Sequence, residues 1–170
     1  RISYGIRTSS NVEPVRVANV TVANNNGYGM CIEASTVTAV NSIFYKDACG
    51  EVDLDAGGVL NLSRTVLGSS ETSGGTIEGT PWYVTSNPFD ANYVVTRAAR
   101  TTSGESLVNN GDNSSVTTTK DADGKTRIVN GTVDVGALER QLETPSLVVT
   151  TNLDVVDNTD GLVSLRDAIA

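Results

Sequence analysis

The chain has 170 residues, a formal charge of −8, no histidine, two cysteines and one tryptophan. No run of apolar residues exceeds three, so the sequence contains no transmembrane segment and no signal-peptide core. The lack of histidine excludes a Ser-His-Asp triad and imidazole metal sites. Two cysteines are too few for a four-thiolate zinc site. The acidic charge disfavours nucleic acid as a partner. Valine and threonine supply about a quarter of the residues, a composition typical of β-structure.

Residues 1–80 contain an internal repeat of 22 residues. Apolar positions recur at this offset: Val15 with Val37 and Val59, Ala18 with Val40 and Leu62, Val22 with Phe44 and Val66, Met30 with Val52, Ile32 with Leu54, and, after one extra residue, Ile77. Short β-rich segments with Gly, Asn and Asp corners at this period predict the coils of a parallel β-helix. Arg64 falls in a column with Val20 and Ser42, and the pattern gives no reason for a charge there.

Beyond residue 80 the repeat ends. Residues 81–140 contain Pro81 and Pro88, predicted short strands at 93–96 and 126–130, and a hairpin turn at Asp-Ala-Asp-Gly, residues 121–124. An open stack edge invites aggregation, so we expect this segment to cover it as a C-terminal cap. Residues 141–146 are predicted to form a linker, and residues 147–170 a new strand followed by a helix. Ser164 and Asp167 have capping-box spacing at the start of that helix.

Two stretches resemble a known family. The first contains three short segments: Leu-Val-Asn-Asn-Gly-Asp-Asn at 107–113, Asp-Ala-Asp-Gly-Lys-Thr-Arg-Ile-Val-Asn-Gly at 121–131 and Asp-Val-Gly-Ala-Leu-Glu at 134–139. These segments resemble the C-terminal end of bacterial right-handed parallel β-helix surface proteins, with Lys125 and Leu138 in place of the usual Asn and Tyr. Residues 146–170 resemble the N-terminal opening of the same family, with Val163 and Asp167 in place of Cys and Glu. The segment that resembles a C-terminal end thus precedes the segment that resembles an N-terminal opening. This order predicts that the chain spans the junction of two modules.

The resemblance implies a secreted or cell-surface protein built from tandem modules. We therefore expect an all-β, right-handed parallel β-helix that acts as a structural stalk, fibre or adhesin shaft. Its expected partners are other modules of the same polypeptide or identical subunits placed end to end, and also polysaccharide or a host surface. The alternative function is a polysaccharide lyase or glycoside hydrolase that acts on the outer face of the β-helix. That alternative needs an outward Arg or Lys beside the acidic residues, and Arg16, Lys46 and Arg64 do not share their column.

The acidic residues of the repeat are the main candidate site. If the strands alternate, Glu33, Asp53 and Asp55 point outward, and Glu51 and Glu78 lie on the same face. Stacked carboxylates suit a solvated face, a calcium site or, as a pair, glycoside hydrolysis. Asp157 and Asp160, in a loop that is similar to calcium-binding loops, are further calcium candidates. We predict no catalytic residue and no cofactor other than this candidate Ca²⁺.

Two other groups of residues stand out. Cys31 and Cys49 form a candidate disulfide: the even cysteine count favours a bridge, whereas strict register stacks Cys31 on Asp53 and disfavours it. Trp82, Tyr83, Phe89 and Tyr93 cluster where the repeat ends, and such aromatic residues either plug the end of the core or stack on sugar rings.

Overall fold

A computed structural model describes residues 3–10, 13–68, 74–141, 148–152 and 163–169. Within these ranges the chain is almost entirely β-structure and turns, as its composition predicts, and all paired strands are parallel. The described elements are β1 (Tyr4–Ser9), β2 (Val15–Ala18), β3 (Thr21–Ala23), β4 (Tyr28–Glu33), β5 (Thr36–Val40), β6 (Ile43–Tyr45), β7 (Gly50–Asp55), β8 (Val59–Ser63), β9 (Val66–Leu67), β10 (Thr76–Glu78), the 3₁₀-helix η1 (Asn113–Ser115) and the helix α1 (Leu165–Ile169).

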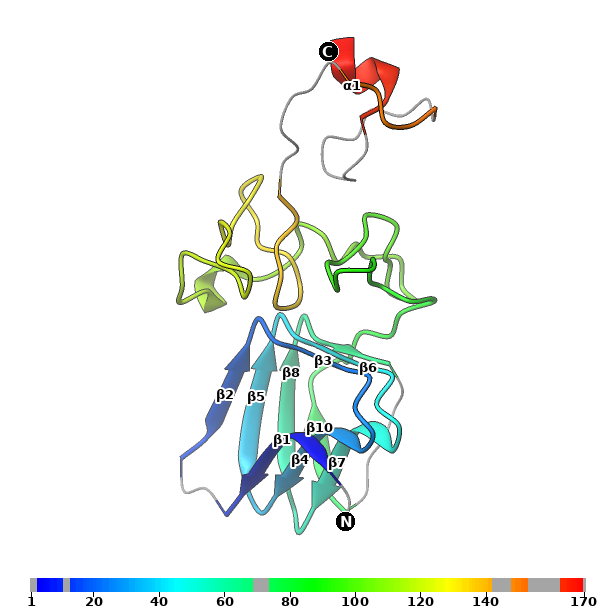
Figure 1. The fold of residues 1–170 in the computed structure, drawn as a ribbon. Helices are drawn as coiled ribbons and strands as arrows, with labels where there is room; N and C mark the ends of the chain where they lie inside the picture. Colours follow the sequence, from blue (N-terminus) through cyan, green and yellow to red (C-terminus); the bar gives the residue numbers. More distant parts are fainter. Residues whose placement is uncertain (1–2, 11–12, 69–73, 142–147, 153–162, 170) are drawn as a thin grey trace.

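The strands form three parallel sheets, and successive strands of the chain go to different sheets (Figure 1). The first sheet contains β1-β4-β7, the second β2-β5-β8-β10 and the third β3-β6-β9. Three consecutive strands therefore make one layer, with one strand in each sheet. The first layer is β1 to β3, the second β4 to β6, and the third β7 to β9.

The register of the layers differs from a strict 22-residue repeat at one place. Glu33 pairs with Asp55 at an offset of 22, whereas Val37 pairs with Leu60 at an offset of 23. The extra residue lies in the Gly57-Gly58 corner between β7 and β8, where Gly57 has φ +79°. The predicted columns that contain Val59, Leu62 and Val66 are therefore wrong by one position, and Ile77 pairs with Leu60 of the second sheet instead of following Leu54. The pairs of Met30 with Val52 and Ile32 with Leu54 are confirmed.

The corrected register explains Arg64. Asn19, Asn41 and Arg64 all have left-handed backbone conformations, with φ of 55°, 50° and 46°, and they follow β2, β5 and β8. The N–H of Asn19 donates to Val40, and that of Asn41 donates to Ser63, so the three residues form one corner column. Because a left-handed residue turns the chain sharply and points its side chain away from the core, a charge is tolerated there.

The apolar core runs through the stack between the three sheets. The inward side chains come from every layer and include Met30, Ile32, Val37, Phe44, Leu54, Leu60 and Leu67, each with no exposed surface. Contacts between layers dominate, because one layer alone cannot enclose its own apolar side chains.

A second core lies on the opposite face of the third sheet. Ile43 and Val66 point outward from β6 and β9 and contact buried side chains of the side segment, residues 81–140. These are Phe89, Val95, Ala99, Leu107 and Val135. The side segment thus lies against the outer face of the third sheet (Figure 1), and Trp82 continues that sheet through a parallel bridge to Val66.

The side segment is built from turns and isolated bridges. The strands predicted at 93–96 and 126–130 do not form, and single antiparallel bridges join Phe89 to Val95 and Lys120 to Thr126 instead. The Asp, Asn, Ser and Thr side chains that crowd this segment bond to nearby backbone groups, which competes with regular pairing. The hairpin turn at 121–124 is confirmed, since Asp121 N–H donates to Lys125 and Gly124 has φ +77°.

One loop of the side segment contacts all three layers. Arg16 in the first layer donates to the Ser115 carbonyl (2.9 Å), and Arg64 after the third donates to the carbonyl and side-chain oxygens of Asn110 (2.6 and 2.9 Å). Between them, the buried Asn41 side chain donates to the Asp112 carbonyl (3.0 Å) and accepts from its N–H (2.7 Å). Residues 110–115, the clip loop, therefore tie the layers together along the stack.

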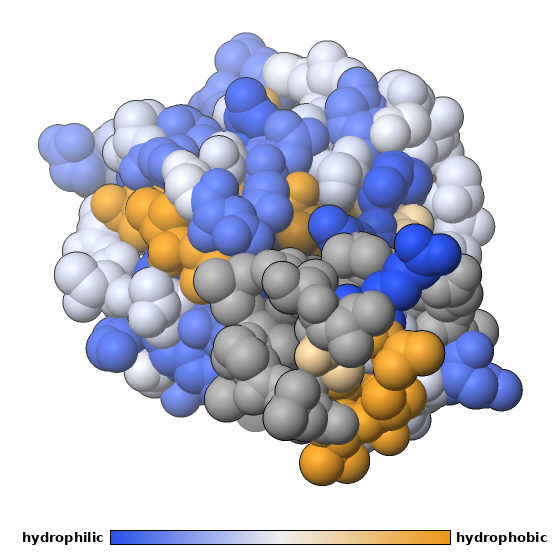
Figure 2. Space-filling view, turned by 90° about the horizontal axis from the view of Figure 1, so that it is seen from above, coloured by the Kyte–Doolittle hydropathy of each residue, from blue (hydrophilic) through white to orange (hydrophobic). Residues whose placement is uncertain are grey.

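The C-terminal part lies beyond the side segment at the top of Figure 1. Thr150 N–H donates to the Val163 carbonyl (2.8 Å), and α1 begins directly after Ser164 as the sequence predicts. Residues 148–150 form no regular strand. Val148, Val149 and Leu165 are exposed, and orange apolar surface borders the grey atoms in Figure 2.

The register can be tested with two adjacent residues of β8. Leu60 has no exposed surface, so Leu60→Ala should cost about 2–5 kcal/mol of unfolding free energy, whereas Val59→Ala, at a half-buried position, should cost about 1 kcal/mol or less. Urea unfolding monitored by circular dichroism measures both. A larger cost for Val59→Ala would show that the strict 22-residue register is correct.

Candidate functional site

The outer face of the first sheet holds most of the predicted acidic residues. Arg7, Cys31 and Asp53 occupy one outward column, and Ser9, Glu33 and Asp55 occupy the next. Arg7 Nη2 lies 2.8 Å from Glu33 Oε2, and both side chains are partly exposed. This face therefore does contain an outward basic residue, which the repeat pattern missed because Arg7 precedes the recurring positions.

Two other acidic residues lie elsewhere. Glu78 is on β10 beside Asn61, on the outer side of the second sheet. Glu51 has only 3% of its surface exposed and accepts a hydrogen bond from Lys46 N–H (2.9 Å). The prediction that Glu51 and Glu78 share the outer face of the first sheet is wrong. Glu51 follows Gly50, the first residue of β7, and its carboxylate reaches the Lys46 N–H at the left-handed corner after β6.

Glu51 lies beside a second buried carboxylate. Asp47 Oδ1 accepts from the N–H and side-chain amide of Asn25 (2.8 and 2.7 Å), and its Oδ2 has no hydrogen-bond partner in the described chain. Burial raises the pKa of Asp47, and the charge of Glu51 adds to that rise. A Cβ atom at Gly29 would lie 2.3 Å from Asp47 Oδ2, so this corner requires glycine.

The calcium candidates do not form one cluster. Glu33, Asp53 and Asp55 share the first sheet and Glu78 lies on the second, whereas Asp157 and Asp160 lie outside the described residues. The described part of the chain contains no group of three or more His, Cys, Asp or Glu side chains arranged to hold a metal ion. Calcium binding therefore stays a prediction without a defined ligand set.

Both cysteines are free thiols in the structure. Cys31 is buried in β4, although it points outward, and Cys49 is exposed in the bend before β7. Burial raises the pKa of the Cys31 thiol, the nearby Asp53 carboxylate raises it further, and Arg7 lowers it. A thiol held in this way is a poor nucleophile at neutral pH.

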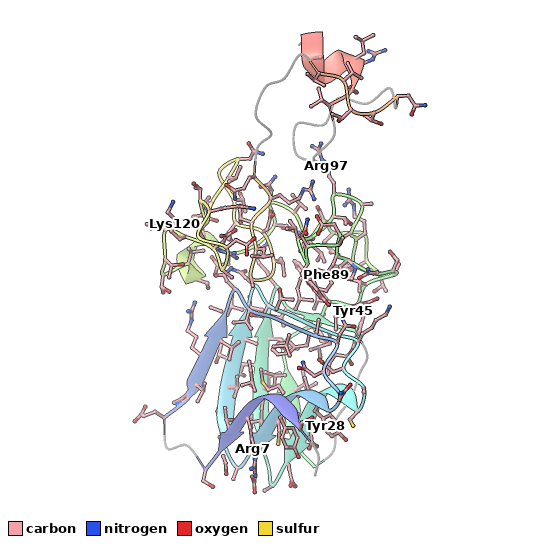
Figure 3. The ribbon with its side chains drawn as sticks, viewed as in Figure 1. Arg7, Tyr28, Tyr45, Phe89, Arg97 and Lys120 are labelled. Atoms are coloured by element: carbon pink, nitrogen blue, oxygen red, sulfur yellow. The ribbon has the colours of Figure 1, made fainter. Side chains whose placement is uncertain are left out.

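The aromatic residues gather at the junction of the stack and the side segment. Phe89 contacts Tyr45 edge-on, with ring centroids 5.9 Å apart, and lies 5.6 Å from Tyr93 (Figure 3). Phe89 is buried, while Tyr93 is 47% exposed. The hydroxyl of Tyr93 accepts a hydrogen bond from the Asn24 side chain (3.0 Å). These rings thus help to join the side segment to the third sheet, and one of them remains open to solvent.

The residues that carry the family resemblance build a buried polar network. Glu139 accepts from the N–H groups of Val129 and Asp134 (both 2.9 Å), and Asp134 accepts from those of Asn109 and Arg140 (2.7 and 2.8 Å). The Arg127 guanidinium, 2% exposed, donates to the carbonyls of Asp134, Gly136 and Ala137. Asp121 accepts from the N–H groups of Asp123, Lys125 and Glu139, so the loop that is similar to a calcium site is a tight turn.

The network raises the pKa values of its two buried carboxyl groups, Glu139 and Asp134. Burial and the nearby Asp134 carboxylate raise the pKa of Glu139 to about 7, although the two N–H donors and Arg127 act in the opposite direction. Burial also raises the pKa of Asp134. Folding therefore makes Glu139 easier to protonate than a free glutamate.

Comparison with family models, with curated proteins and with solved structures finds no match to this chain. Among the residues that the structure describes, no helix has the length and apolar character needed to cross a bilayer.

The network predicts a specific pH dependence of stability. Because the folded pKa of Glu139 lies above the ordinary value of 4.5, its stabilising contribution is complete below about pH 4.5 and is lost as the pH rises through about 7. We expect the unfolding free energy to fall by about 2 kcal/mol between pH 5 and pH 8. Glu139→Gln should remove most of this dependence, while Glu78→Gln, on β10, should retain it. An unchanged slope in Glu139→Gln would contradict the assignment.

The thiols offer a second test. Titration of the unreduced, denatured protein with a thiol reagent should detect both cysteines, and the native protein should show one fast reaction, at Cys49, followed by a slow one, at Cys31. Cys49→Ser should remove the fast phase. If the unreduced, denatured chain shows no reactive thiol, the two cysteines form the disulfide that their even number favours.

Proposed function

We propose that residues 3–10, 13–68 and 74–80 form part of a right-handed parallel β-helix, and that the chain is a rigid structural module of a secreted or cell-surface protein. The observation that carries the proposal is that β1 to β9 go in turn to three parallel sheets, with the inward residues of all layers in one core. Connections between parallel strands of one sheet are right-handed in nearly all proteins, which supports the assigned hand.

The contacts between layers supply the stiffness. Backbone hydrogen bonds between the strands of neighbouring layers run along the stack, and each inner layer is held by two others. The clip loop adds one contact to each layer through Arg16, Asn41 and Arg64. A force that separates the layers must therefore break these side-chain bonds together with the sheets.

The unpaired strand edges of the first layer suggest what the chain binds. Within the described residues, β1, β2 and β3 are each paired on one side, to β4, β5 and β6. Unpaired strand edges accept further strands. We propose that another module of the same polypeptide, or an identical subunit placed end to end, supplies the next layer of a stalk or fibre.

An enzymatic alternative has one specific observation in its favour. Arg7 lies beside Glu33 and in one column with Asp53 on the outer face of the first sheet, which is the combination of basic and acidic groups that action on a uronate polymer requires. Fold alone does not establish such an activity. The alternative is therefore a polysaccharide lyase or glycoside hydrolase on this face.

A pulling experiment tests the structural role. In a single-molecule force measurement, the wild-type stack and side segment should unfold together in one event. Asn41→Ala leaves the half-buried N–H and carbonyl of Asp112 without their partners, so it should lower the unfolding free energy by about 1–3 kcal/mol and also the unfolding force. Thr38→Ala, on the outward face of β5, is the matched control.

Two outcomes would contradict the proposal. Stepwise peeling of layers at low force in the wild type would show that the stack is no rigid unit. Steady release of unsaturated uronate from pectate or alginate with Ca²⁺, abolished by Arg7→Ala, would establish the enzymatic alternative instead.

A further inference from the structure

The seam between the first layer and the side segment is hollowed by three adjoining clefts. The first, of about 280 Å³, is bordered by Ala18 and Asn19 of the first layer and by side-segment residues that include Lys120, Ala122, Arg127 and Ala137. The second, of about 350 Å³, shares Ala122 and Ala137 with the first, and the third, of about 210 Å³, shares Tyr93 with the second. Their walls follow the first layer from Ala18 to Asn24, so the clefts lie in a row. We call this row the seam groove.

One end of the seam groove holds hydrogen-bond donors that lack acceptors. Arg127 Nε and Asn19 Nδ2 are both buried without a partner in the described chain, and both residues line the first cleft. Lys120 lines it as well, at the left of the side segment in Figure 3. A buried donor without an acceptor is destabilising, so a small adjustment that admits an oxyanion would recover the lost hydrogen bonds.

The acidic groups near the groove are already engaged. Asp121 accepts from three backbone N–H groups, Asp90 accepts from those of Asn92 and Val94, and Asp123 lies 3.7 Å from the Lys125 ammonium. Their lone pairs therefore compete little for the donors at the first cleft. The charged residues that line the first cleft are Lys120, Arg127 and Asp121, so two cations face one carboxylate there although the chain as a whole is acidic.

The other end of the groove presents an aromatic ring. Tyr93 borders the second and third clefts, has a left-handed backbone with φ +61°, and is 47% exposed. Such a conformation is strained for a bulky residue and is found preferentially at functional positions. Its hydroxyl is fixed by Asn24 and its ring by Phe89, so the ring is held in place beside a cleft that Asn87 and Lys46 also line.

We propose that the seam groove binds an acidic oligosaccharide, with a sugar carboxylate at the Asn19, Lys120 and Arg127 end and a pyranose ring against Tyr93. Three features favour a glycan: charged and amide donors, an exposed ring of fixed orientation, and an elongated course that suits several sugar units. A peptide strand is disfavoured at the face of β3, because the side segment already uses it. Ala137 N–H donates to the Thr21 hydroxyl (3.0 Å), and a Cβ at Gly136 would meet Thr21 and Ile43. The proposal does not depend on the structural role of the stack.

The test is an NMR titration of the ¹⁵N-labelled full chain with three acidic probes: oligogalacturonate, oligomannuronate and a hyaluronan tetrasaccharide. We expect at least one of them to shift amide signals at residues 18–24, 91–94 and 117–122. Lys120→Ala should weaken its binding about fivefold, as expected for one partly exposed ion pair, and leave the binding of the matching neutral oligosaccharide unchanged.

Tyr93→Gly removes the ring and also the backbone strain, so it should weaken both acidic and neutral ligands without unfolding the chain. Lys125→Ala, a lysine of the same turn that does not line the clefts, should bind as the wild type does. No shift with any of the three probes would overturn the proposal, as would shifts confined to the Arg7 face. Shifts at the groove with an extended Val/Thr-rich peptide but with no glycan would assign the groove to a peptide strand.

Discussion

The corner column of Asn19, Asn41 and Arg64 is the constraint on which the other features of the molecule depend. Each residue turns the chain from the second sheet into the third with a left-handed backbone, and each points its side chain outward at the same corner. The repetition of this corner keeps the strands of successive layers in register. It also provides two of the three side chains that hold the clip loop. The position of the side segment, and therefore of the seam groove, follows from the geometry of this corner.

The sequence predicts the layers better than it predicts the faces of individual residues. A 22-residue period in apolar residues is sufficient to place the strands, because every layer must supply inward side chains to one core. A corner can take up an extra residue without disturbing the strands beside it, as Gly57-Gly58 does, and this shifts every later residue by one position. For this reason the strict repeat puts Val59 in the inward column that Leu60 occupies, and it does not show the corner role of Arg64. Periodicity cannot detect such a shift when Val and Leu stand next to each other.

The side segment was predicted less well, for a different physical reason. Its course is set by side chains that satisfy backbone groups rather than by strand pairing, and such contacts leave no period in the sequence. The residue types did contain a signal. Asp121, Arg127, Asp134 and Glu139 are among the charged positions of the stretches that resemble the family, and all four bond to backbone groups. On the candidate site, Glu33, Asp53 and Asp55 were placed correctly on one face. The sequence did not predict that Arg7 lies beside Glu33 or that Asp47 and Glu51 form a buried pair. Both arrangements depend on how successive layers stack on one another.

The same packing leads to both the mechanical proposal and the binding proposal. Ile43 and Val66 are apolar on the outer side of the third sheet, and the side segment buries them. In the same column the first layer has Thr21, and two residues later Ala23 pairs with Tyr45; both are smaller than their partners in the second layer and border the second cleft. The side segment therefore buries Ile43 and Val66, whereas beside the first layer, which it contacts at Thr21 through the Ala137 N–H, it leaves the second cleft. The third sheet must be covered for stability, and a groove forms where the covered side chains, those of the first layer, become small. The same first layer has the open strand edges, so the groove runs beside them.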